Sequence, residues 1–202
     1  MTVEDYEARA RRGGDDAVRE ASRFLYGEGP VHQALKQIAG RLEALGIPYA
    51  VVGGMALNAH GYHCTTVDVD VLVTSEGLLE VREKLEGWDY MLLPEGDRLR
   101  DTENGVRIDF VVSSEFQDPA SVSVKLDGIR YLTLEKLIEM KLSWGMARSG
   151  RLKHLADVQE MIKELRLKAD LSEHLDARIR KVYTRLWNDV HDHPDPHQEY
   201  SS

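Results

Sequence analysis

The sequence has little cysteine and no long apolar segment, and each scarcity excludes a class of protein. Cys64 is the single cysteine, which excludes an internal disulfide and a cysteine-ligated zinc site. No apolar run approaches the roughly 20 residues that a membrane-spanning helix needs. The opening MTVEDYEARARRGG lacks the pattern of a signal peptide. We therefore expect a cytoplasmic protein with no membrane partner.

Surplus positive charge is also lacking. The formal net charge is -9, which disfavours broad, sequence-independent binding to a nucleic-acid backbone. Arg148, Arg151 and Lys153 lie close together in sequence, but such a cluster is usually a solvated helix end. With 202 residues and 42% hydrophobic residues, the chain is long enough for one domain, or for a catalytic domain with a small helical appendage.

Valine and aspartate alternate through residues 67–73. Side chains two apart on a strand share a face, so Asp68 and Asp70 point the same way while the valines point into the core. Two carboxylates held this close repel each other and lose water, so folding gains nothing from the pair. A divalent cation with oxygen ligands, typically Mg²⁺ carrying a substrate phosphate, compensates for this. The alternative is an ordinary edge strand with solvated acids.

A glycine pair precedes the acidic strand. The apolar run 49–52 stops at Gly53 and Gly54, which suits a turn where the backbone comes close to a ligand and offers N–H groups to an anion. Thr66, just before the acidic strand, could hydrogen-bond a phosphate or simply begin the strand.

These two motifs together resemble a known signature. Gly53-Gly54, thirteen intervening residues and Asp68-Val69-Asp70 resemble the polymerase-beta-type nucleotidyltransferase superfamily, which also expects a third acid on a later strand. The apolar run 106–112 supplies Asp109 on the face opposite its apolar neighbours.

The resemblance implies a reaction and its residues. It implies transfer of a nucleoside monophosphate from a nucleoside triphosphate such as ATP to an acceptor hydroxyl, with release of pyrophosphate. It further implies that Asp68, Asp70 and Asp109 are catalytic and bind Mg²⁺ or Mn²⁺, while the glycine pair and Thr66 hold the phosphates.

A lysine lies on the apolar side of the helix expected over 134–148. At 100° per residue, Lys141 falls within the arc of Leu134, Leu137 and Ile138. A lysine there must reach solvent along its own stem, pair with an acid or meet a ligand anion such as the triphosphate. In the following helix, His154 and Asp157 border the apolar arc.

The sequences of these two helices resemble a smaller group within that superfamily. TLEKL through Lys141, followed by RLKHLADV, resembles the C-terminal helices of the AbiEii/AbiGii-type nucleotidyltransferases, which are toxins of abortive-infection and toxin–antitoxin systems. Lys141 and Asp157 match that pattern and would bind the nucleotide, whereas His154 stands where an aspartate is expected. The likeness covers about residues 49–165. It implies an RNA end (tRNA included) or a protein hydroxyl as acceptor, and an antitoxin protein as a partner.

The order of the elements predicts an α+β fold: a small mixed or antiparallel sheet flanked by helices, with a C-terminal helical segment. We expect an N-terminal polar, partly helical extension over 1–28, a catalytic domain over 29–132, a helical subdomain over 133–190 and a disordered tail over 191–202. Expected helices cover 15–26, 31–45, 55–60, 76–86, 133–166 and 171–187, and expected strands cover 49–52, 67–73, 88–93, 98–102, 106–112, 122–124 and 129–132.

Two other functions share these motifs. A catalytically inactive chain of the same fold would bind a nucleotide or a partner protein and regulate it. An antibiotic-modifying nucleotidyltransferase also carries the glycine turn and the Asp-x-Asp strand. We favour the active enzyme acting on RNA or protein, because all three carboxylates and the lysine are present.

Overall fold

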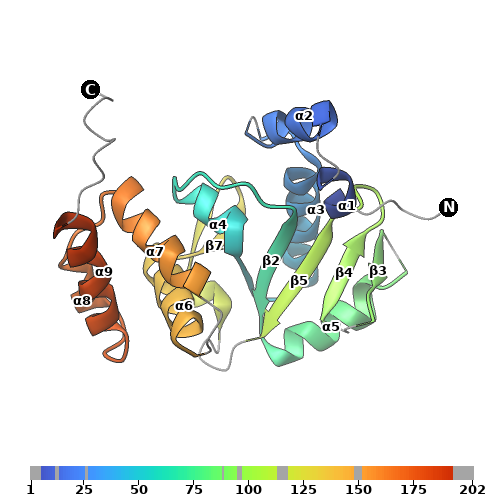
Figure 1. Cartoon of the computed structure of the whole chain (residues 1–202). Helices are drawn as coiled ribbons and strands as arrows, with labels where there is room; N and C mark the ends of the chain where they lie inside the picture. Colours follow the sequence, from blue (N-terminus) through green and yellow to red (C-terminus); the bar gives the residue numbers. More distant parts are fainter. Residues whose placement is uncertain are drawn as a thin grey trace. The chain divides into compact units, whose positions relative to one another are not determined.

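Figure 1 shows the computed structural model, which describes residues 6–11, 14–25, 27–87, 89–94, 97–112, 118–147 and 152–192. The chain divides into two compact units, Met1–Thr133 and Leu134–Ser202. The first unit carries the sheet and the second is helical, which confirms the predicted α+β class. Within the described residues, no helix combines the length and the apolar character needed to cross a membrane.

A seven-stranded mixed sheet forms the centre of the first unit. Its strand order is β3-β4-β5-β2-β1-β7-β6. The β2–β5 and β1–β7 pairs are parallel, and the other pairs are antiparallel. The strands are β1 (Tyr49–Val52), β2 (Asp68–Val73), β3 (Tyr90–Leu92), β4 (Arg98–Asp101), β5 (Arg107–Val112), β6 (Ser123–Leu126) and β7 (Ile129–Leu132).

The long helix α3 (Pro30–Leu45) packs against this sheet, as its apolar stripe predicts. Ile38 and Leu42 are fully buried, and α3 contacts β2 and β7. Pro30 opens the helix and Gly46, in the left-handed region at φ 69°, ends it. The unit also contains α1 (Tyr6–Ala10), α2 (Gly14–Leu25), α4 (Gly53–Ala59), α5 (Ser75–Leu85) and a short 3-10 helix, Pro119–Val122.

Two helices of this unit have well-defined first turns. Thr74 is the N-cap of α5, because its side chain accepts a hydrogen bond from Gly77 N at 3.0 Å. The helix expected from residue 55 begins two residues earlier, at Gly53. The glycine pair is therefore the first turn of α4 and not a loop in front of it.

The second unit contains α6 (Leu134–Ala147), α7 (Leu152–Glu164), α8 (Leu171–His174) and α9 (Arg180–Asp192). The single helix predicted over 171–187 is wrong, because the chain leaves the helix after α8. The Asp176 side chain accepts the backbone N–H of Arg178 at 2.8 Å, a local bond that competes with helix formation. Leu175 and Ile179 are buried on either side of this turn. Residues 191 and 192 belong to α9, and the rest of the predicted tail lies outside the described residues.

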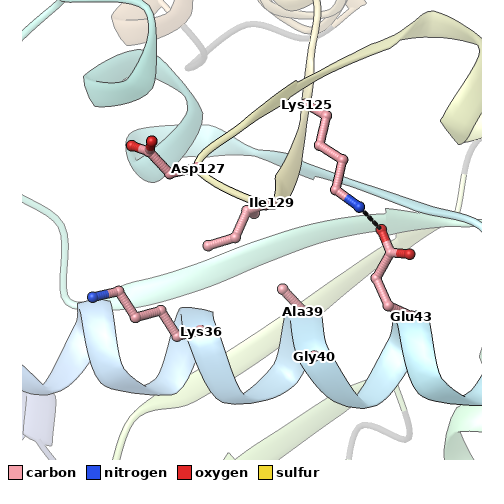
Figure 2. Close-up of a pocket in the computed structure, with 8 residues that line it drawn as sticks. Lys36, Ala39, Gly40, Glu43, Lys125, Asp127 and Ile129 are labelled. Carbon is pink, nitrogen blue, oxygen red and sulfur yellow. Dashed lines mark hydrogen bonds and ion pairs between the residues drawn. The ribbon is translucent and has the colours of Figure 1, made fainter.

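A groove of about 400 Å³ lies between α3 and the β6–β7 turn (Figure 2). The Lys125 ammonium lies 3.3 Å from the Glu43 carboxylate across it, and Ala39 and Gly40 provide the helix surface. None of the residues predicted to bind metal or nucleotide lines this groove. The candidate site is elsewhere in the unit.

Candidate active site

Three carboxylates lie on one face of the parallel β2–β5 pair. In β2, Asp68 and Asp70 alternate with Val69 and Val71, which are fully buried on the other face. The strand register places Asp109 of β5 directly opposite Asp70. The fold therefore brings together the three acids that the sequence singles out. Their roles in catalysis and metal binding stay predictions.

A positive side chain lies within this acidic cluster. Arg107 is opposite Asp68 in the register and two residues before Asp109, so it shares their face. Its guanidinium nitrogens lie 2.7 Å from Asp68 Oδ2 and 3.0 Å from Asp109 Oδ1. Arg98, opposite Asp109 on β4, lies 3.3 Å from the same Asp109 oxygen. The charge of the carboxylates is thus partly balanced by the chain itself.

Asp109 lies in an environment that disfavours its charged form. Burial raises the pKa of Asp109 above its ordinary value, and the charges of Asp68 and Asp97 add to this, while Arg107 and Arg98 act in the opposite direction. Asp109 Oδ1 is buried and accepts no hydrogen bond from any described residue, although two arginine nitrogens are near. A raised pKa, and a buried oxygen that has two ion pairs but no hydrogen bond among the described residues, are properties of a group that can take up a proton or a cation.

The glycine turn fits closely around two of the predicted residues. Gly53 has φ +62°, and a Cβ placed on it would lie 1.9 Å from Asp70 Oδ2. A Cβ on Gly54 would lie 2.8 Å from the Cβ of Thr66. The Thr66 hydroxyl donates to Asp68 Oδ1 at 2.7 Å. Both glycines are therefore needed for the close approach between this turn and the acidic strand.

Asn58 ties the turn to the loop that leads into β2. Its Nδ2 donates to Gly54 O at 2.9 Å and to Cys64 O at 2.7 Å, and its Oδ1 accepts from Cys64 N at 3.3 Å. No motif in the sequence marks Asn58, because its role depends on three backbone groups, of Gly54 and Cys64, that only the fold brings together. These bonds fix the loop from which Thr66 reaches Asp68.

The donor set suits a hard divalent cation. Carboxylate oxygens are the ligands that Mg²⁺ and Mn²⁺ prefer, and the buried Asp109 Oδ1 is oriented into the cluster without a hydrogen bond. In the described part of the chain, however, no group of three or more His, Cys, Asp or Glu side chains is arranged to hold a metal ion. Arg107 contacts both Asp68 and Asp109 in this arrangement. The residues therefore fit a divalent ion in the kind of ligand that they offer.

The second unit holds the other two predicted residues, and it pairs them. Lys141 is buried on α6, and its ammonium lies 2.6 Å from Asp157 Oδ2 of α7. Of the three outcomes that the sequence leaves open for this lysine, the structure shows pairing with an acid. His154 packs edge-on against Trp144, with 5.6 Å between ring centroids. The nucleotide-binding role of Lys141 and Asp157 stays a prediction.

Asp109→Asn is expected to stabilise the protein in the absence of divalent ions. The pKa of Asp109 is higher in the folded than in the unfolded protein. Its contribution to the free energy of unfolding is therefore fully present below the unfolded pKa, about 3.9. That contribution is lost as the pH rises through the folded pKa. Ionised Asp109 therefore opposes folding at pH 7.5, and a neutral amide of the same shape does not. We expect Tm to rise on the order of 2 °C at pH 7.5 and to be unchanged near pH 3.5. Calorimetry in EDTA measures this, and a lower Tm at pH 7.5 contradicts it.

Asp157→Asn is expected to destabilise the protein, because it leaves the buried Lys141 ammonium without its carboxylate. Breaking one half of such a pair costs more than removing an exposed one, and we expect a loss of about 2 kcal/mol. Urea unfolding of the full chain measures the loss. The matched control is Asp176→Asn, whose ion pair with Arg178 is exposed, so its loss should destabilise the protein clearly less. Equal losses would contradict a buried role for the pair.

Several solved structures are similar to this fold. An antigenic nucleotidyltransferase-like protein from Paracoccidioides brasiliensis is similar over 81% of this chain and 88% of its own, with a TM-score of 0.50 and 16% identity. The antibiotic-resistance factor ANT(2'')-Ia is similar over 78% of this chain and 95% of its own, with a TM-score of 0.49 and 17% identity. JHP933 from Helicobacter pylori covers 89% of this chain and 93% of its own, with a TM-score of 0.48 and 14% identity. No protein-family model and no curated protein sequence matches the chain. The chain has a nucleotidyltransferase-type fold.

Proposed function

We propose that the protein is a metal-dependent nucleotidyltransferase that moves a nucleoside monophosphate from a nucleoside triphosphate to a hydroxyl of an RNA end or a protein. The observation that supports this most strongly is the β2–β5 register, which sets Asp109 opposite Asp70 on the face that also carries Asp68. Arg107 and Arg98 offset only part of the repulsion among these three carboxylates. A reaction that binds phosphate through divalent cations would give a reason to gather them there.

Each carboxylate has a proposed task. Asp68 and Asp70 would hold Mg²⁺ or Mn²⁺, and Asp109 would complete that site or accept the proton of the acceptor hydroxyl. Bound ions would supply charge neutralisation for the triphosphate and a lowered pKa for the acceptor hydroxyl. Asp109, opposite Asp70 in the strand register, is thus assigned a place in the metal site and the acceptance of the hydroxyl proton.

The transfer step conserves atoms and charge. The acceptor oxygen forms a bond to the α-phosphorus as the bond from that phosphorus to the bridging oxygen breaks. Pyrophosphate leaves with the bonding electrons, and the hydroxyl proton passes to the carboxylate of Asp109. The Gly53-Gly54 turn and Thr66 would position the phosphates, because their backbone and hydroxyl lie against the acidic strand.

The narrower toxin assignment is part of this proposal. The helices that carry Lys141 and Asp157 support it through their likeness in sequence to the AbiEii/AbiGii type. A toxin of this kind would arrest growth when expressed alone, and a neighbouring antitoxin protein would reverse the arrest. Induction in a bacterial host, with the Asp70→Ala variant as control, measures this directly.

A labelled-nucleotide screen tests the proposed activity. The full chain is incubated with each of four α-³²P nucleoside triphosphates, Mg²⁺ or Mn²⁺, and one of three acceptors: total RNA, total protein or a panel of aminoglycosides. We expect metal-dependent pyrophosphate release and label in the RNA or the protein. Nucleotide binding by calorimetry without any release would instead favour the inactive regulatory protein. Release that appears only with aminoglycosides would favour the antibiotic-modifying alternative.

A further inference from the structure

A fourth carboxylate reaches the cluster from the N-terminal end of the chain. Glu7 of α1 lies 100 positions from Arg107 in sequence, and its Oε2 accepts from Arg107 at 3.0 Å. Arg107 therefore has Asp68 and Asp109 on one side and Glu7 on the other. No motif in the sequence of α1 indicates a role at this site, because only the fold brings this helix to β5.

Helix α1 is held at this position by the residue before Glu7. Tyr6 is buried, with 3% of its surface exposed, and its backbone N–H donates to Gly105 O at 3.1 Å. Gly105 is two residues before Arg107, so the same segment that leads into β5 anchors α1. About four-fifths of the Glu7 side chain is shielded from solvent, which makes its interaction with Arg107 stronger than a surface ion pair.

Arg107 is in competition with any cation bound by the same acids. Burial lowers the pKa of Arg107, but Asp109, Asp68 and Glu7 together outweigh burial and raise it, so the guanidinium stays charged. A divalent cation on Asp68 and Asp109 would repel that charge from a few ångströms away. Arg107 must then leave both carboxylate oxygens, and a half-buried guanidinium without an acceptor costs free energy. Glu7 already contacts the Arg107 guanidinium and offers it an acceptor, so this free-energy cost is avoided.

We propose that Glu7 is a positioning residue for the metal site: it takes over Arg107 when a divalent cation binds Asp68 and Asp109. This inference depends on the proposed function, because it assumes that these acids bind metal. Arg107 is thus an internal cation that keeps the carboxylates together in the metal-free protein. Helix α1 is the part of the chain that lets it move aside.

The proposal is tested by measuring the Mn²⁺ affinity of the full chain, which needs no activity assay. The protein is first stripped of metal and kept free of nucleotide. Glu7→Gln should weaken Mn²⁺ binding about tenfold, because the amide oxygen that replaces the carboxylate accepts from the guanidinium without a charge. The matched control is Asp97→Asn, because Asp97 acts on Asp109 through its charge and forms no ion pair with Arg107 among the described residues. Its effect should be about twofold.

The outcomes separate this inference from the proposed function. A larger loss for Glu7→Gln than for Asp97→Asn supports the positioning role. Equal losses, or no loss with Glu7→Gln, overturn it and leave the metal site intact. No Mn²⁺ binding by the unaltered chain overturns the proposed function as well.

A second measurement follows Arg107 directly. In ¹⁵N-arginine-labelled protein, the Nε–Hε resonance of Arg107, identified with Arg107→Lys, should shift when Mg²⁺ is added. In the Glu7→Gln variant, the same resonance should broaden or move toward the position of a solvated arginine, because the acceptor that remains at position 7 carries no charge. An Arg107 resonance that is unchanged by saturating Mg²⁺ overturns the proposal.

Discussion

Asp70→Ala should abolish nucleotide transfer, by roughly a thousandfold or more, while the protein stays folded. Asp70 lies at the centre of the proposed site, opposite Asp109 on one side and against the Gly53 turn on the other. Its oxygens would bind the ion that carries the triphosphate, and alanine offers no ligand there. The fold should survive, because the buried neighbours Val69 and Val71 are untouched and one repelling charge is removed.

The measurement is metal-dependent pyrophosphate release at saturating nucleoside triphosphate, with Tm recorded for each variant. Asp70→Asn separates the charge from the shape and should lose almost as much activity. The matched control is Asp127→Asn in the β6–β7 turn. Asp127 has φ 48°, a conformation that asparagine also tolerates, and it lies in the groove away from the acids. Activity retained by Asp70→Ala would refute the assignment.

Much of this site follows from strand periodicity. The alternation in β2 requires that Asp68 and Asp70 share a face, because the buried valines fix which face is the core. The central aspartate of β5 is equally determined by its apolar neighbours. The sequence could not give the pairing of the two strands. That depends on the parallel register of β2 with β5, which sets Asp109 opposite Asp70.

The residues that the sequence did not single out are those whose meaning depends on long-range contacts. Arg107 shares a face with Asp109 by simple alternation, so its approach to the acids was open to prediction from spacing alone. Glu7 was not, since nothing local indicates that α1 packs beside Gly105. The break in the helix at Leu175 has a local cause, because the Asp176 side chain accepts a hydrogen bond from the backbone N–H two residues on. The sequence does not reveal it, because the apolar residues Leu175 and Ile179 keep the spacing of a helix across the break.

Gly53→Ala should reduce transfer by roughly a hundredfold, because a 1 Å displacement of a reacting group is enough for such a loss. The added methyl would meet Asp70 Oδ2 at 1.9 Å, so the carboxylate must turn away from the position that faces Asp109. The residue also has φ +62°, which costs an alanine about 1 kcal/mol in backbone strain. We expect a fall in Tm of about 2–4 °C in addition to the lost activity.

Gly128→Ala separates these two effects. Gly128 has φ +83°, in the same left-handed region, but a Cβ on it would meet nothing within 4 Å. Its fall in Tm should be similar to that of Gly53→Ala, since both carry the strain, while its pyrophosphate release should equal that of the unaltered chain. Loss of activity in Gly53→Ala alone therefore reports the contact with Asp70 and not a general weakening of the fold. Full activity in Gly53→Ala would contradict this prediction. The Asp70 carboxylate could then turn aside without loss of transfer, and the close fit between the glycine turn and the acidic strand would have no part in the reaction.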